Sequence, residues 1–210
     1  PAPPAAHTPA LPPALTQTHT GTNARSIGWD YRLAHRLTLD LAEGETVTAV
    51  YTSTVADDSG TGSDTATQDV TITITGTNDA PTITVVDVTG AVTEDAATPN
   101  LTDSGSVTFA EVDDTELLGS SVALSSTSTT GPAIPAGLTT ALNSALSLTQ
   151  SGTNDGSIGW DFSVANSLTQ YLADGETVTV VYTITVADDS GTGNDTATQD
   201  VTITITGTND

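Results

Sequence analysis

Short runs of acidic and amide side chains recur along the sequence, and they are the residues best suited to chemistry. They are Asn78 and Asp79; Glu111, Asp113 and Asp114; Asp188 and Asp189; and Asn209 and Asp210. Carboxylate and amide oxygens are ligands of hard cations, and calcium takes roughly six to eight oxygen ligands. Neighbouring carboxylates also repel one another unless a positive charge lies between them. We therefore expect a calcium site wherever the fold brings several of these runs together.

The same inventory argues against catalysis. Residues 80–210 contain no Cys, His, Lys or Arg, so most pairings of a nucleophile with a general base are absent there. No serine lies in a GxSxG motif, and no Gly-rich phosphate loop follows a strand and precedes a helix. The three histidines, His7, His19 and His35, have no metal-ligand spacing. We expect that the protein is not an enzyme.

The charge balance restricts the partners of the protein. The chain carries 26 acidic residues against three arginines and no lysine, for a net charge of -23, and residues 80–210 hold 17 of the acidic residues. Such a domain cannot neutralise itself with salt bridges, so its carboxylates lie apart, bind cations or depend on salt screening. We expect no nucleic-acid partner, because the protein and the nucleic acid would both be negatively charged and would repel each other. We also expect no direct membrane insertion, because no apolar stretch approaches the roughly 18 residues needed.

An internal repeat divides the chain. Ser26–Asp79 matches Ser157–Asp210 at a constant offset of 131 residues, with 43 of 54 positions identical. We therefore predict a full module over residues 80–210 and a partial, truncated copy over residues 1–79. Upstream of this match, PALPPALT at 9–16 pairs loosely with PAIPAGLT at 132–139, at an offset of 123. The partial copy has no counterpart of residues 80 to about 131.

Segments rich in Val, Ile and Thr predict seven strands in the full module: 82–88, 104–109, 121–126, 145–149, 157–164, 176–186 and 195–206. Val201, Ile203 and Ile205 alternate with threonines, which indicates one buried and one exposed face. We predict an all-β fold, an antiparallel two-sheet sandwich of immunoglobulin type, with Trp160 and Tyr182 in its core. The segment 166–173 is interpreted as a helical turn or a crossover.

This topology predicts where the acidic runs lie. The incoming linker, the loop after the second strand and the loop before the last strand share one pole of an immunoglobulin-type sandwich. The first three runs belong to these three segments, so we expect them to converge, whereas Asn209 and Asp210 would serve a following module. Glu94 and Asp95 are weaker candidates. The alternative for each run taken alone is an ordinary turn, because Asn-Asp and Asp-Asp-Ser-Gly are common turn sequences.

Four segments resemble a known family. GTNDAPTI at 76–83, VTED at 92–95, DGETVTVVYTITVADDSGTG from Asp174 and the terminal TITGTND resemble the VCBS repeat of giant bacterial adhesins, which belongs with cadherin-like and immunoglobulin-like β-sandwich repeats. The resemblance implies tandem modules that form a calcium-stiffened stalk on a bacterial cell surface, secreted and serving attachment and biofilm formation. Its partners would be neighbouring repeats of the same chain, together with surface glycans or other cells.

Two other functions stay open at this level. A ligand-binding module would recognise a carbohydrate or a host protein, and an exposed aromatic cluster would favour it. The sequence offers only Trp29, Trp160 and four tyrosines for such a cluster. A calcium-independent acidic spacer would instead be stabilised by any salt, because its charges need only screening.

Overall fold

The chain consists of two compact units. The computed structural model describes residues 15–19, 26–33, 40–57, 65–95 and 98–209. Contacts separate unit 1, Pro1–Thr77, from unit 2, Asn78–Asp210. The linker residues Asn78 and Asp79 therefore belong to the same unit as the other expected ligands. In the part of the chain that the structure describes, no helix is both long enough and apolar enough to cross a membrane.

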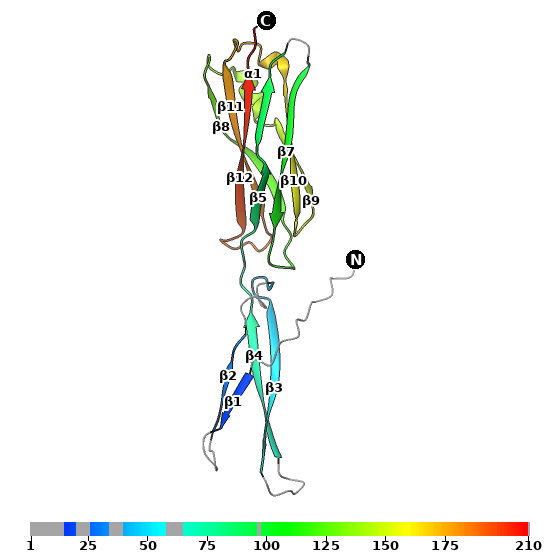
Figure 1. Ribbon diagram of the computed structural model, residues 1–210, viewed down its shortest axis with the longest axis vertical. Helices are drawn as coiled ribbons and strands as arrows, with labels where there is room; N and C mark the ends of the chain where they lie inside the picture. The colour runs from blue at the N-terminus through cyan, green and yellow to red at the C-terminus, as the bar shows by residue number, and fades with distance from the viewer. Residues whose placement is uncertain (1–14, 20–25, 34–39, 58–64, 96–97, 210) are drawn as a thin grey trace. The chain divides into compact units, whose positions relative to one another are not determined.

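The described residues of unit 2 form two four-stranded sheets, which face each other in Figure 1. One sheet has the order β5 (Thr82–Asp87), β7 (Asn100–Ala110), β10 (Gly156–Ala165), β9 (Leu146–Ser151). The other has the order β6 (Thr89–Thr93), β12 (Thr196–Thr206), β11 (Thr177–Ala187), β8 (Gly119–Thr129). Each of the seven predicted strands has a counterpart among these. The order of the strands within each sheet is that of immunoglobulin-type sandwiches, in which a sheet of strands A, B, E and D packs against a sheet of strands C, F and G.

The first strand differs from the prediction because it divides between the two sheets. β5 pairs antiparallel with β7, whereas β6 crosses over and pairs parallel with β12. The crossing brings the backbone close to the core at Gly90, where an added Cβ would lie 2.5 Å from Cδ1 of Ile203. The sandwich is therefore not wholly antiparallel.

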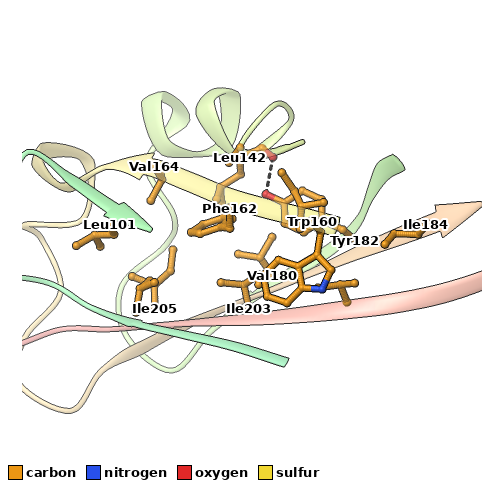
Figure 2. Packing of buried hydrophobic residues seen from close by; sticks show 14 of the residues in the cluster. Leu101, Leu142, Trp160, Phe162, Val164, Val180, Tyr182, Ile184, Ile203 and Ile205 are labelled. Atoms are coloured by element: carbon orange, nitrogen blue, oxygen red, sulfur yellow. Dashed lines mark hydrogen bonds between the residues drawn. The ribbon is translucent and has the colours of Figure 1, made fainter. Parts of the chain in front are cut away.

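The core of unit 2 lies between its two sheets. Every second side chain of β11 is buried from Val178 to Val186, and Val201, Ile203 and Ile205 of β12 are fully buried. Figure 2 shows Trp160 and Phe162 of β10 facing these strands, with Tyr182 beside Phe162. The core positions predicted for Trp160 and Tyr182 are confirmed, because their exposed fractions are 0% and 1%.

Of the two short helices that the structure describes, only one was predicted. α1 (Ala136–Leu142), which buries Leu138 and Leu142 against the core, was not expected, whereas the 3₁₀ helix η2 (Asn166–Leu168) lies in the segment 166–173, interpreted as a helical turn or a crossover. The hydroxyl of Tyr182 donates a hydrogen bond of 2.7 Å to the backbone carbonyl of Leu142, which fixes α1 to β11.

The described part of unit 1 contains two hairpins. One pairs β1 (Leu15–His19) with β2 (Ile27–Tyr31), and the other pairs β3 (Thr46–Ala56) with β4 (Thr65–Thr75). Leu15 lies opposite Tyr31 as Leu146 lies opposite Phe162, so the 131-residue offset extends to β1. The 123-residue offset expected upstream does not hold at Leu15, because strand pairing aligns this residue with Leu146.

The hydroxyl of Tyr182 provides a test of core packing. Tyr182→Phe removes the donor to the buried carbonyl of Leu142, so we expect the free energy of unfolding to fall by about 1–2 kcal/mol. The matched control is Tyr171→Phe, because the Tyr171 hydroxyl is buried without a hydrogen-bond partner among the described residues. That substitution should not lower stability in urea unfolding experiments, because it removes a buried polar group that makes no hydrogen bond. Equal losses for both variants would contradict this account.

Candidate metal centre

Strand register brings four connecting segments to one pole of unit 2. Thr82 at the start of β5 lies opposite Ala110 at the end of β7, and Gly156 at the start of β10 lies opposite Phe109. Ala187 at the end of β11 lies opposite both Thr196 and Gly119. The segments that meet there are the linker 78–81, the loop 111–118, the turn 152–155 and the loop 188–195.

Hydrogen bonds join the linker to two of these loops. Nδ2 of Asn78 donates to Oδ2 of Asp188 at 3.2 Å and to the carbonyl of Asn194 at 2.7 Å. The backbone N–H of Asp79 donates to Oδ2 of Asp113 at 2.9 Å. The structure therefore brings together the linker run, the 111–114 run and the 188–189 run.

Local hydrogen bonds orient the carboxylates of both loops. Oε1 of Glu111 accepts from the N–H groups of Val112, at 2.7 Å, and Asp113, at 3.3 Å. Oδ1 of Asp188 accepts from the N–H of Ser190 at 2.9 Å and from its hydroxyl at 2.5 Å. Glu111 and Asp188 are each the first residue of their loop. Hydrogen bonds from the N–H groups of the next residues to these carboxylates form a turn and fix the orientation of the side chain.

Four buried carboxylates lie at this pole, those of Glu111, Asp113, Glu116 and Asp188, and three of them converge. One oxygen from each of Glu111, Glu116 and Asp188 lies within 4.8 Å of the others, and the exposed fractions of these residues are 7%, 5% and 8%. Two oxygens on opposite sides of a calcium ion, each at about 2.4 Å, are about 4.8 Å apart. The spacing is thus compatible with a shared cation. We call these three residues the carboxylate trio.

Two oxygens of the trio lack any partner. Oε2 of Glu111 and Oε2 of Glu116 are buried and accept no hydrogen bond from the described residues. A buried carboxylate oxygen without a donor is unfavourable, since it has lost its water and gained nothing in return. Both oxygens could therefore coordinate a cation without losing a hydrogen bond to the described residues.

The electrostatics of the pole raise the pKa values of Glu116 and Glu111. Burial raises the pKa of Glu116 from 4.5 to about 7, and the charges of Asp188, Asp113, Glu111 and Asp189 act in the same direction. Burial also raises the pKa of Glu111, as do the charges of Asp113 and Asp188, although the two backbone N–H donors oppose the shift. Residues 80–210 contain no basic side chain that could compensate. Without a cation, Glu116 therefore binds a proton up to near neutral pH.

The remaining expected ligands lie outside the trio. Asp114 and Asp189 are exposed, and Asp189 accepts a hydrogen bond of 3.0 Å from the N–H of Leu117. Asn209 is exposed and follows β12, so it lies at the opposite pole of unit 2. Asp210 lies outside the described residues.

Sequence reasoning missed Glu116 and Asn154. Glu116 belongs to the run EVDDTE that starts at Glu111, so the spacing of acidic residues within this loop was an available signal. Asn154 lies in the turn 152–155, whose sequence GTND is the same as at 76–79 and was an available signal. Its amide donates to the carbonyls of Asp113, at 2.9 Å, and Glu116, at 3.4 Å. This amide holds the acidic loop in place.

Glu94 is buried at the opposite pole, which the sequence indicated only weakly. Its exposed fraction is 1%, and its Oε2 accepts a hydrogen bond of 3.4 Å from the N–H of Thr208. The hydroxyl of Thr208 donates to the Glu94 carbonyl at 3.2 Å. Glu94 therefore attaches the segment after β12 to the end of β6.

Unit 2 is thus an all-β sandwich with a buried carboxylate cluster at one pole. No family model matches the chain, and no curated protein matches it. Among solved structures, it is similar to CfaE, the adhesive subunit of CFA/I fimbria of enterotoxigenic Escherichia coli, with a TM-score of 0.42 and 14% identity over 78% of this chain. The chain spans 59% of the length of that protein. It is also similar to a Porphyromonas gingivalis W83 protein of unknown function, with a TM-score of 0.26 and 10% identity, covering 94% of this chain and 81% of that one.

The raised pKa of Glu116 predicts an unusual pH dependence. The folded protein keeps this proton up to about pH 7, whereas the unfolded chain releases it near pH 4.5. The folded state binds more protons between these values, so stability in chelator should fall as pH rises through this window. Glu116→Gln has no proton to lose, and at about pH 8 it should be more stable than the natural chain by about 1–3 kcal/mol.

The matched control for this experiment is Asp114→Asn, which removes an exposed charge from the same loop. It should retain the pH dependence of the natural chain. Urea unfolding at about pH 5 and about pH 8, in chelator throughout, gives the comparison. Parallel pH profiles for the natural chain and Glu116→Gln would contradict the assignment.

Proposed function

We propose that unit 2 is a calcium-binding extender module of a secreted bacterial surface adhesin, of the VCBS type, in a tandem array that includes the partial copy in unit 1. The observation that carries the calcium site is the pair of buried, unpartnered oxygens of Glu111 and Glu116 within the carboxylate trio. The wider adhesin role rests on the sequence resemblance. The module has no catalytic role in this proposal.

The donor set favours calcium over other ions. All ligands available at the pole are oxygens, and unit 2 has no His or Cys, which zinc and copper sites use. Magnesium requires a near-ideal octahedron and keeps much of its water. Irregular loops with several carboxylates, backbone carbonyls and side-chain amides suit the variable coordination of calcium better.

Calcium would act on the linker as well as on the trio. Asn78 and Asp79 contact Asp188 and Asp113, whose charges also act on Glu116. An ion in the trio would reduce repulsion among these carboxylates and so strengthen the attachment of the linker to unit 2. Repeated along an array of modules, such attachment would stiffen an extracellular stalk that supports attachment to surfaces, surface glycans or other cells.

A thermal unfolding experiment tests the ion. Calcium at about 100 times its dissociation constant should stabilise the folded state by about 2.7 kcal/mol, which raises Tm by several degrees. Sodium at matched ionic strength should not reproduce the rise. Glu111→Gln and Glu116→Gln should each reduce the calcium-dependent rise, whereas the control Asp114→Asn should retain it. Equal rises with calcium and sodium would support the acidic-spacer function instead.

Scattering tests the proposed stiffening. The full chain should show a narrower distribution of end-to-end distances with calcium than with chelator, because the linker residues would be fixed to unit 2. Asn78→Ala removes the amide that contacts Asp188 and Asn194, and it should weaken this response. Identical scattering in calcium and in chelator would contradict the proposed stiffening. It would not contradict ion binding, which the unfolding experiment tests separately.

A further inference from the structure

The linker contacts both of the loops that supply the carboxylate trio. Glu111 and Glu116 lie in the loop 111–118, which follows β7 in one sheet. Asp188 lies in the loop 188–195, which joins β11 to β12 in the other sheet. A cation held by the trio would take oxygens from both loops and so keep them together.

Two adjacent linker residues, Asn78 and Asp79, each bind one of these loops. Nδ2 of Asn78 donates to Oδ2 of Asp188 at 3.2 Å and also to the carbonyl of Asn194, near the end of the same loop. The N–H of Asp79 donates to Oδ2 of Asp113, in the other loop, at 2.9 Å. We call Asn78 and Asp79 the strap, because together they connect the two loops.

The strap reaches the trio through Asp188 and Asp113. Asp188 is itself a member of the trio. The N–H of Asp113 donates to Oε1 of Glu111 at 3.3 Å, and the carbonyl of Asp113 accepts a hydrogen bond of 3.2 Å from the N–H of Glu116. Asp113 therefore connects the strap with both glutamates. Attachment of the strap thus restrains both loops where the three carboxylates meet.

Repulsion between negative charges opposes this arrangement. Residues 80–210 contain no basic side chain, and Glu116 lies within the field of four other carboxylates, those of Glu111, Asp113, Asp188 and Asp189. The two loops also contact each other directly, because the N–H of Leu117 donates to Oδ1 of Asp189 at 3.0 Å. The strap adds a side-chain donor and a backbone donor to this contact. With the strap attached, a cation meets carboxylates that are already held close together, which raises its affinity.

We propose that Asn78 and Asp79 are positioning residues that set the calcium affinity of the trio, so that tension on the linker weakens the binding of the ion. This proposal rests on the calcium site of the proposed function. Coupling between two events is reciprocal, so attachment of the strap and binding of calcium strengthen each other by the same factor. The chain passes through Asn78 and Asp79 before it reaches β5, so tension on the linker acts on the strap first.

Calcium binding would then depend on load. A module at rest keeps its strap attached and holds the ion at a low calcium concentration. A module under tension has a detached strap, so it needs more calcium to fill the same site. At a fixed calcium concentration, the most heavily loaded modules of an array would lose their ions first, and their linkers would become flexible.

Calcium titration of the full chain by calorimetry, at a temperature where the chain is folded, tests the positioning role. Loss of a hydrogen bond to a metal ligand weakens metal affinity by about 10–100-fold, so Asn78→Ala should raise the Kd for calcium at least about tenfold. Asp79→Pro has no N–H to donate to Asp113, and it should have the same effect. The matched control is Thr77→Ala, because Thr77 is exposed and directly precedes the strap. It should bind calcium like the natural chain.

Asp79→Asn separates positioning from direct coordination. It keeps the N–H that binds Asp113 and removes the carboxylate, so it should weaken calcium binding less than Asp79→Pro does. Circular dichroism checks that each variant keeps its strands. Asn78→Ala and Asp79→Pro break separate contacts, so either one tests the proposal if the other variant does not fold.

Single-molecule pulling tests the dependence on load. The chain contains no cysteine, so an introduced cysteine provides a unique attachment point. With the second attachment at the C-terminus, Thr77→Cys places the strap under tension, whereas Thr82→Cys, at the start of β5, bypasses it. The readout is the calcium concentration that gives half of the maximal increase in folded-state lifetime. This concentration should rise with force for the first attachment and rise less for the second.

Three results would overturn the proposal. The first is a Kd for calcium that is the same in Asn78→Ala, Asp79→Pro and the natural chain. The second is an equal loss of affinity in Asp79→Asn and Asp79→Pro, because the carboxylate of Asp79 would then act on the ion directly. The third is the same force dependence at both attachment points. Absence of calcium binding by the natural chain would instead reject the proposed function itself.

Discussion

The structure of unit 2 depends on burying carboxylates in a domain that has no basic side chain. Glu111, Glu116 and Asp188 cannot form ion pairs within the unit, so only amide groups, hydroxyls, protons and external cations can compensate them. Amide and hydroxyl donors carry partial charges, and they are used on one oxygen of Glu111 and on both oxygens of Asp188. Burial and the negative charge that these donors do not offset raise the pKa of Glu116. The same uncompensated charge makes the pole responsive to the ions around it.

The fold was predictable wherever a local pattern carried the information. Alternation in Thr177–Ala187 and Thr196–Thr206 predicted both strands and their buried faces, because a period of two has only one buried side. The convergence of the linker with two loops followed from the expected topology. The crossing of β6 and the burial of Glu116 were not predictable, because both depend on contacts with distant segments that no local pattern encodes.

The two units separate local from non-local determinants of structure. The sequence SIGWD is identical in both, and it forms a strand in both with the same hairpin register. Yet Trp29 is half exposed and Trp160 is fully buried. Strand formation is thus encoded within the hairpin, whereas burial belongs to the strands that cover it. The comparison of the two copies distinguishes the determinants of strand formation from those of burial, which a single copy would not do.

The parallel pairing of β6 with β12 determines how unit 2 would carry a pulling force. Asn78 enters the unit at one pole and Thr208 leaves it at the other, so tension between them draws β6 and β12 in opposite directions along their length. The ladder from Thr89 to Thr93 is then loaded in shear, together with the flanking bonds of Val88 and Glu94. Bonds loaded in shear share the force and must break together, whereas a hairpin pulled open at one end unzips bond by bond. Under such tension the divided first strand would act as a mechanical clamp.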